Sequence, residues 1–193
     1  MFQNGLSKST YQNLELLAKL PELKNFYLAG GTACALHFGH RLSFDLDFFT
    51  ETEFDQSNLA DVINKLGKFS IEQIVKDTLL GKLNKEKISF FYYRYPLLKP
   101  TILWKGVNIV SIYDLIGMKI EAISGRGKKR DFIDLFFLTK HISLEKALKI
   151  YDKKYKALSN NLRHLLNSLV YFNDADQDEM PKMIKKVPWE IMG

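Results

Sequence analysis

Residues 26–50, FYLAGGTACALHFGHRLSFDLDFFT, constrain the fold more than any other part of the chain. An apolar run leads directly into Gly30-Gly31-Thr32, and the residues after this turn have helical composition up to Gly39. A strand-like alternation follows, in which Asp45 and Asp47 stand between apolar residues, Phe44 among them. Because alternate residues of a strand point to one face, the two carboxylates are expected to project side by side, with Phe44 and the other apolar neighbours facing the core.

Two neighbouring carboxylates repel each other, and a divalent cation relieves that repulsion. Mg²⁺ prefers oxygen ligands and commonly takes one or two carboxylates together with substrate phosphates. The glycine turn predicts a phosphate site, because free N–H groups at a helix N-terminus bind phosphate and glycine lets it approach closely. Thr32 is expected to cap this helix or contact phosphate, and Arg41 to contact phosphate. We therefore expect Asp45 and Asp47 to hold Mg²⁺ or Mn²⁺ beside bound phosphates.

The composition favours a packed protein with anionic partners. The chain has 193 residues, 46% of them hydrophobic, which is enough for a sizeable core and excludes a disordered protein. The formal charge of +6 favours a nucleotide, RNA or an acidic protein as partner. A single cysteine, Cys34, excludes an internal disulfide and favours the cytoplasm. No run approaches the roughly 20 apolar residues of a membrane span, and the first residues lack a signal-peptide pattern. We expect a cytoplasmic protein with no membrane contact.

The remaining pattern predicts an α+β fold, a mixed β-sheet with flanking helices followed by a C-terminal helical domain. Ser7 or Ser9 can cap a first helix, and Asp55 or Ser57 a later one. The capping box Ser111-x-x-Asp114 predicts a helix to about Ile123, and a second helix is expected at 128–141. Strands are expected at 43–49, 69–75, 78–83 and 87–93, with a further short one near 104–110. We divide the chain into an α/β domain, residues 1–110, and a helical domain, residues 111–193, that completes the active-site cleft.

The order of strand, Gly-Gly-Thr, short helix and Asp-x-Asp strand resembles the nucleotidyltransferase superfamily typified by DNA polymerase β. More closely, GGTACALHFGHRLSFDLDFF resembles the AbiEii/AbiGii toxin family, the nucleotidyltransferase-like toxins of type IV toxin–antitoxin systems. Residues 114–138, DLIGMKIEAISGRGKKRDFIDLFFL, are also similar to that family. The resemblance covers residues 26–138, and the pattern after Ser143 is only generically helical.

The resemblance implies metal-dependent transfer of a nucleotidyl group from an NTP to an acceptor, with RNA such as a tRNA end as the acceptor in some members. It also implies a cognate antitoxin protein as a partner. By position, Gly30, Gly31 and Thr32 match the phosphate loop, Asp45 and Asp47 the metal carboxylates, Lys119 the conserved lysine, and Arg130, Asp131 and Asp134 the last motif.

The second motif has two interpretations. Asp131 and Asp134 are three residues apart and share one face of an otherwise apolar helix, where acids are paired or functional. Lys119 lies in an apolar run and could reach a triphosphate as a point charge. The alternative is a structural ion pair between Lys119 and one of the two aspartates. The basic run that ends at Arg130 likewise either contacts phosphate or forms a solvated turn.

One departure from the family pattern concerns the general base. Many active nucleotidyltransferases carry a third acid on a later strand, where it activates the acceptor hydroxyl. The aligned residue here is Ser89, which cannot act as a base without help. Either Asp131 or Asp134 takes that role, or the chemistry is altered. Two other functions stay open: a non-catalytic module that binds nucleotide or RNA through a degenerate transferase fold, and a related phosphotransferase.

Overall fold

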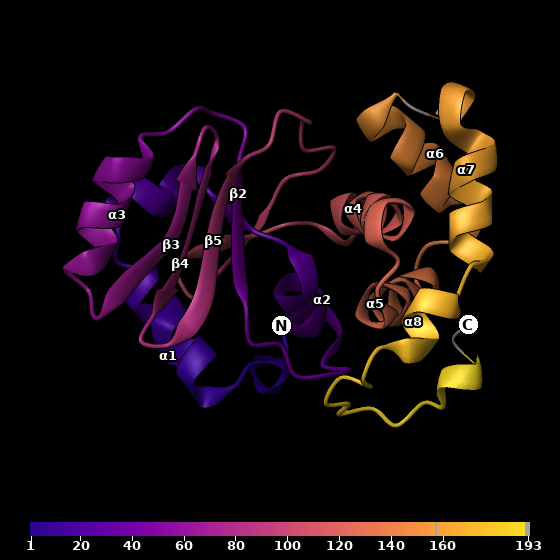
Figure 1. The fold of residues 1–193 in the computed structure, drawn as a ribbon, viewed down its shortest axis with the longest axis horizontal. Helices are drawn as coiled ribbons and strands as arrows, with labels where there is room; N and C mark the ends of the chain where they lie inside the picture. The colour runs from indigo at the N-terminus through magenta and orange to yellow at the C-terminus, as the bar shows by residue number, and fades with distance from the viewer. Residues whose placement is uncertain (157, 192–193) are drawn as a thin grey trace.

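The computed structural model describes residues 1–156 and 158–191, and the side chains of all of these except residues 158–161. In this part of the chain a seven-stranded mixed sheet has the order β3-β4-β5-β2-β1-β7-β6. Figure 1 shows β3, β4, β5 and β2 side by side in this order. The strands are β1 Tyr27–Leu28, β2 Leu46–Thr50, β3 Phe69–Val75, β4 Thr78–Leu83, β5 Glu86–Tyr92, β6 Ile102–Trp104 and β7 Val107–Ile109.

The centre of the sheet is formed by strands far apart in sequence. β2 pairs in parallel with β5, in a register that sets Asp47 opposite Ser89, and β1 pairs antiparallel with β2 and parallel with β7. β3, β4 and β5 form an antiparallel meander. The sequence predicted one strand near 104–110, whereas the structure has a hairpin of β6 and β7. Lys105 and Gly106 both have positive φ, which closes this turn within two residues.

Four of the described helices begin at a side-chain cap, and among these caps Ser7, Asp55 and Ser111 were predicted. Ser7, Asp55, Ser111 and Ser143 each accept a backbone N–H at a helix start. Gly127, in left-handed conformation, ends the helix that was expected to stop near Ile123. The helices are α1 Lys8–Leu17, α2 Gly30–Phe38, α3 Gln56–Asn64, α4 Ile112–Arg126, α5 Lys129–Thr139, α6 Leu144–Tyr155, α7 Leu158–Val170 and α8 Asn173–Gln177, with short 3₁₀ turns at Gln3–Gly5, Pro21–Asn25 and Trp189–Ile191.

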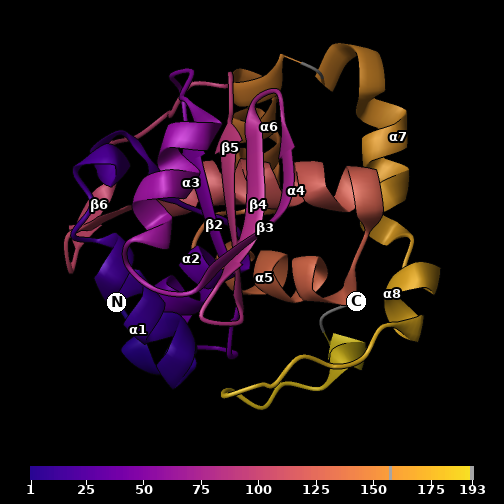
Figure 2. The ribbon, with the colours of Figure 1, turned by 60° about the vertical axis from the view of Figure 1, so that its left-hand side comes forward.

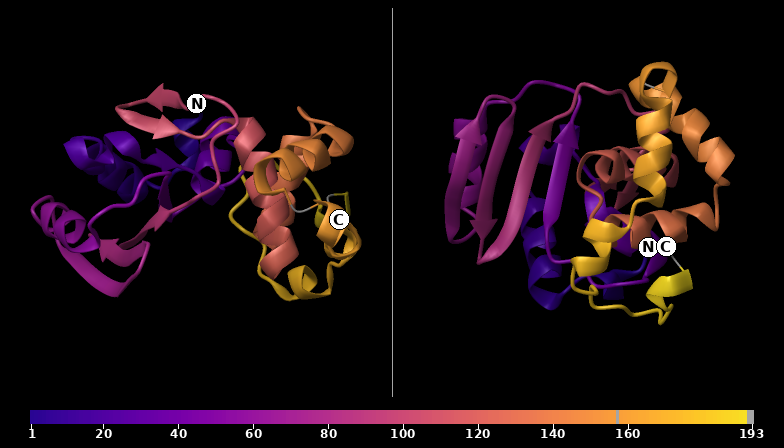
Figure 3. Two further views of the ribbon diagram at one scale, coloured as in Figure 1. Left: turned by 90° about the horizontal axis from the view of Figure 1, so that it is seen from above. Right: turned by 45° about the vertical axis from the view of Figure 1, so that its right-hand side comes forward.

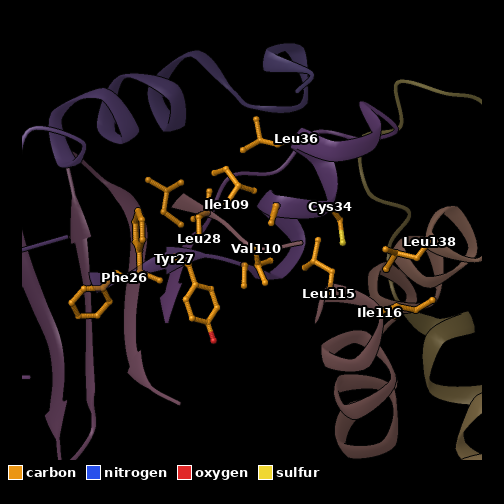
Figure 4. Close-up of a cluster of buried hydrophobic side chains, with 14 of the residues drawn as sticks. Phe26, Tyr27, Leu28, Cys34, Leu36, Ile109, Val110, Leu115, Ile116 and Leu138 are labelled. Atoms are coloured by element: carbon orange, nitrogen blue, oxygen red, sulfur yellow. The ribbon is translucent and has the colours of Figure 1, made fainter. Parts of the chain in front are cut away.

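Helix α2 lies between the sheet and the C-terminal helices, with α4 to α8 gathered on the side away from β3 (Figures 1 and 3). In Figure 2, β3 and β4 come forward, and α4 and α5 lie partly behind them. α4 packs against α2, α5, α6 and α7. Side chains of β1, α2, β7, α4 and α5 meet in one core, including Leu28, Cys34, Ile109, Ile116 and Leu138 (Figure 4). All the described strands precede Ser111, and the division into domains at residue 110 stays a prediction.

The alternation around the two aspartates holds only within β2. Leu46 and Phe48 are buried, as predicted. The prediction that Phe44 faces the core is wrong, because Phe44 is 39% exposed. β2 begins at Leu46, so the strand alternation does not extend back to Phe44. None of the described helices is long and apolar enough to cross a membrane.

Candidate active site

A cavity of about 210 Å³ lies where α2, β2, β5 and α4 meet, and we call it the polar cavity. Seven of the predicted site residues line it. They are Gly30, Gly31, Arg41, Asp45, Asp47, Lys119 and Arg130, joined by Ser43, Leu80, Lys87, Ser89, Phe91 and Arg126. Thr32, Asp131 and Asp134 are not among the described lining residues.

The glycine pair forms the first turn of α2. The helix begins at Gly30, which has a φ of +64°, and Ala29 before it offers no side-chain cap. The N–H groups of Gly30 and Gly31 therefore have no acceptor within the helix. A Cβ at Gly30 would meet Asp47 Oδ2 at 2.9 Å, and a Cβ at Gly31 would collide with the guanidinium of Arg41. Both positions need glycine, and both bring backbone to the cavity wall.

Thr32 has a structural role instead of the predicted cap or phosphate contact. Its hydroxyl donates to the carbonyl oxygen of Asp45 and shares a hydrogen bond of 2.8 Å with Ser43 Oγ. The side chain of Thr32 is buried, and Thr32 follows Gly31, the last residue of α2 among the described lining residues of the polar cavity. Thr32 therefore fixes the backbone that carries Asp45.

The two predicted metal ligands lie at the wall of the polar cavity. Burial raises the pKa of Asp47, the charge of Asp45 raises it further, and a hydrogen bond with Ser89 acts in the opposite direction. A cation between the carboxylates would remove this unfavourable interaction. No described group of three or more His, Cys, Asp or Glu side chains could enclose a metal. The oxygen donors fit Mg²⁺ that completes its shell with water and substrate phosphate, and they do not form an all-protein cage.

Lys119 connects the cavity to the second motif. Its Nζ lies 3.0 Å from Asp131 Oδ1 and 2.7 Å from Asp134 Oδ2. Burial works against its charge, but Asp134 and Asp131 outweigh it and raise the pKa of Lys119. The alternative of an ion pair is therefore realised in the structure. Lys119 still lines the polar cavity, so it can contact a bound anion while the two aspartates hold it in place.

Asp134 is the centre of a buried cluster. It accepts Arg41 Nε and Nη2, each at 2.8 Å, and His40 Nε2 at 2.8 Å, besides Lys119. Burial alone would raise the pKa of Asp134, but Arg41 and Lys119 outweigh it and hold the pKa well below its usual range. Asp134 thus holds Arg41 and Lys119 in position at the cavity wall, although Asp134 is not itself among the described lining residues. Arg41 Nη1 also donates to the Leu42 carbonyl, which leaves each terminal nitrogen one further N–H for phosphate.

Two cations of the cavity were missed by the sequence analysis. Arg126 Nε donates to Asp131 at 2.8 Å, although the helix that carries Arg126 was expected to end near Ile123. Lys87 precedes Ser89 by two residues and shares its face of β5, a position that strand alternation could have identified. Arg130 is half exposed and its guanidinium lies 3.9 Å from Asp45. These side chains surround the two aspartates with positive charge, an arrangement that suits a polyphosphate.

An aromatic cavity of about 470 Å³ adjoins the polar cavity. The two share Gly30, Asp47, Phe91, Lys119 and Arg126. One wall comes from the sheet, where the ring of Phe49 lies 5.1 Å from that of Phe91 and 5.3 Å from that of Tyr93. The other wall comes from α4 and includes Met118 and Ala122. Aromatic and aliphatic walls on either side of a gap suit a flat ring system.

A third cavity, of about 520 Å³, lies on the other side of the polar cavity, and we call it the C-terminal cavity. The two share Arg41, Ser43, Asp45 and Arg130. Residues 178–182 form its outer wall, because the chain returns from α8 toward the end of α2 (Figure 1). Leu42 N donates to the Lys182 carbonyl at 2.8 Å, and Ile184 N donates to the His40 carbonyl at 2.8 Å.

The chain is similar to known proteins over most of its length. Residues 14–102 and 97–190 match the model of the family described as "Nucleotidyl transferase AbiEii toxin, Type IV TA system". An uncharacterised protein of Aquifex aeolicus (strain VF5) is 41% identical over 181 residues, which cover 90% of this chain and 86% of that protein.

Two solved structures share the fold. JHP933 from Helicobacter pylori has a TM-score of 0.57 and 21% identity, covering 97% of this chain and 88% of its own. The nucleotidyltransferase toxin MenT4 from Mycobacterium tuberculosis H37Rv has a TM-score of 0.54 and 18% identity, covering 79% of this chain and 65% of its own. The predicted α+β fold with a nucleotidyltransferase-like mixed sheet is confirmed.

Proposed function

The chain belongs to the AbiEii family of nucleotidyl transferase toxins, and from this premise we propose that it transfers a nucleotidyl group from an NTP to an RNA acceptor such as a tRNA, with Mg²⁺ or Mn²⁺ as cofactor. One observation carries the proposal. Asp45 and Asp47 lie beside the free N-terminus of α2 in a cavity walled by cations, and this cavity continues into one that suits a nucleobase. A cognate antitoxin is expected as a partner, since the family is that of a type IV toxin–antitoxin system.

The proposed pose divides the NTP between two cavities. The N–H groups of Gly30 and Gly31 bind the triphosphate at the start of α2. Lys119 and Arg126 neutralise charge on the departing pyrophosphate. The base enters the aromatic cavity, with Phe49 and Phe91 on one side and α4 on the other. Arg41 also contacts the triphosphate, to which it contributes one N–H from each terminal nitrogen, and the pose makes no use of Arg130.

Asp45 and Asp47 would hold the metal ion, which supplies charge neutralisation and alignment of the phosphate when bound. The acceptor hydroxyl oxygen attacks the α-phosphorus in line, a new P–O bond forms, and the bond to the pyrophosphate oxygen breaks. The hydroxyl proton must leave in the same process. Asp131 and Asp134 are unsuited to take it, because ion pairs lower the pKa of both carboxyls. Once Asp45 and Asp47 hold the metal ion, no other acid among the described lining residues can take the proton, and we assign it to solvent water.

The test is incubation of the purified protein with Mg²⁺, total RNA and each labelled NTP in turn. Label is expected to enter RNA with at least one NTP, and the double variant Asp45→Asn, Asp47→Asn is expected to transfer none. A conservative exchange at an exposed helical acid, Glu145→Gln, serves as the control that retains transfer. Full transfer by the double variant would refute the metal site.

A second function is favoured by one observation. Ser89 pairs with Asp47 in the register of β2 and β5, so the third carboxylate of active superfamily members is replaced at that position. A non-catalytic module would bind NTP and release it unchanged. Binding of NTP without transfer, across four NTPs and total RNA, would establish this function in place of the first.

A further inference from the structure

The position of the C-terminal cavity relative to the other two is the first observation. It shares four lining residues with the polar cavity, and among the described residues it shares none with the aromatic cavity. The polar cavity is therefore the middle of three. In-line displacement requires the acceptor oxygen and the leaving pyrophosphate on opposite sides of the phosphorus. An acceptor must then reach Asp45 from a space that the NTP does not fill, and the C-terminal cavity is such a space.

The second observation is the ring of Phe44, which the strand alternation had assigned to the core. Phe44 directly precedes Asp45, is 39% exposed and lines the C-terminal cavity. Its backbone is held in place, because Thr10 Oγ1 donates to the Phe44 carbonyl at 3.1 Å. A partly exposed aromatic ring on a fixed backbone is a platform on which single-stranded nucleic acids can stack a base.

The third observation is positive charge around that ring. Lys182 Nζ lies 5.6 Å from the centre of the Phe44 ring. Arg130 is half exposed, and its ion pair with Asp45 is long, at 3.9 Å. Lys128 also lines the cavity and pairs with Asp178 at 3.1 Å. With Asp45 committed to a metal ion, the remaining acids of the lining are Asp178 and Glu179, of which Asp178 is paired with Lys128 and accepts a hydrogen bond from the N–H of Lys129.

We infer that the C-terminal cavity is the acceptor subsite and that it takes the end of a single-stranded polynucleotide. The terminal base stacks on Phe44, the adjoining phosphate contacts Arg130 and Lys182, and the terminal hydroxyl faces Asp45. The returning segment, residues 178–182, is then part of the active site. This inference rests on the proposed function, since it names the acceptor class and its contacts.

Binding of a fluorescein-labelled single-stranded RNA of twelve nucleotides, measured by anisotropy with Mg²⁺ and without NTP, tests the inference. Phe44→Ala is expected to weaken binding about tenfold, because one stacked base is lost, and Phe44→Trp is expected to restore it. Arg130→Ala is expected to weaken binding and to reduce the dependence of log Kd on log salt by about one. Lys149→Ala, on the exposed face of α6, is the matched charge control and should bind as the wild type does.

Two further measurements separate the inference from the proposed function. NTP affinity should stay within about twofold in Phe44→Ala, Phe44→Trp and Lys149→Ala, since neither Phe44 nor Lys149 lines the polar cavity. Circular dichroism confirms that each variant is folded. Equal RNA affinity in the wild type, Phe44→Ala and Arg130→Ala would overturn the inference, as would tighter binding of a duplex of the same sequence.

A different result would refute the proposed function. Absence of transfer to the same oligonucleotide, in a wild type that binds it through Phe44, would refute nucleotidyl transfer while leaving the binding site in place. Transfer to RNA that is unaffected by Phe44→Ala, Arg130→Ala and Lys182→Ala would preserve the function and overturn the subsite.

Discussion

At the scale of single residues, the metal-free fold disfavours the charged form of Asp47. Burial and the nearby charge of Asp45 raise the pKa of Asp47. A carboxyl with a raised pKa stabilises the fold at low pH, and this contribution is lost as the pH rises through the folded-state pKa. Asp47→Asn should therefore raise the Tm of the metal-free protein by a few degrees at pH 7.

The same variant should lose its response to metal. Mg²⁺ is expected to raise the Tm of the wild type, because it binds the native carboxylates, and to leave the Tm of Asp47→Asn unchanged. Thermal unfolding with and without Mg²⁺ makes both measurements. An equal Mg²⁺-induced shift in the two proteins would place the metal elsewhere.

A pH dependence follows from the same residue. Because Asp47 must be ionised to bind a cation, protons compete with Mg²⁺ at pH values above those at which an ordinary aspartate would be protonated. Mg²⁺ affinity should therefore begin to fall at a higher pH than it does for a site of ordinary aspartates, as measured by calorimetric titration over a series of pH values. A fall that begins only where an ordinary aspartate is protonated would contradict this role of Asp47.

At the scale of elements, the start of α2 is the most demanding local structure. Gly30 has a positive φ, and in Gly30→Ala the added Cβ would lie 2.9 Å from Asp47 Oδ2. It should cost about 1–2 kcal/mol in unfolding free energy and weaken NTP binding at least tenfold. Urea denaturation and NTP titration on the same preparation measure the two effects.

Gly125→Ala is the matched control for stability. Gly125 lies within α4, and an added Cβ meets no atom within 4 Å. This exchange should stabilise the protein by up to about 1 kcal/mol, since alanine favours a helix over glycine by that amount. We expect the two substitutions to change the unfolding free energy in opposite directions. A change in the same direction would contradict the role given to Gly30.

Elements could be predicted from the sequence where the signal is local. Ser7, Asp55 and Ser111 cap helices because capping depends on the next three residues, and the strands of the meander follow from alternation and turns. The site could be predicted in part for the same reason, since Gly30, Asp45 and Asp47 lie within one short segment. Their order along the chain also carried the family resemblance, which the comparisons confirm.

Contacts between distant elements could not be predicted in this way. The bidentate pairing of Arg41 with Asp134 depends on how α5 packs against the residues after α2, and no local pattern encodes that packing. Phe44 was misassigned because alternation alone does not reveal where a strand begins. Arg126 was missed because its function depends on Asp131, on the next helix.

At the scale of the whole molecule, the buried cluster around Asp134 joins the sheet-bearing part to the helical part. It connects His40 and Arg41, which follow α2, with Lys119 of α4. Asp134→Asn would leave buried cations without their partner and should cost about 3–5 kcal/mol in unfolding free energy, as measured by urea denaturation. Since the pKa of Asp134 is depressed, its contribution is present at neutral pH and is lost as the pH falls through its folded-state pKa.

Glu145→Gln is the control for that prediction. Glu145 pairs with Lys149 at 2.5 Å on an exposed helix face, where an ion pair contributes under about 1 kcal/mol. A loss at Asp134 no larger than the loss at Glu145 would show that the cluster does not hold the two parts together.

The returning segment also sets an order of events during synthesis. Residues 40–42 leave the ribosome long before residues 182–184, whose backbone they bond. The nascent chain therefore carries its glycine turn and both aspartates for much of translation without the wall formed by residues 178–182. If that wall completes the acceptor subsite, the nascent chain cannot bind RNA at this subsite while it is still on the ribosome. Binding then begins only when residues 178–182 have folded back.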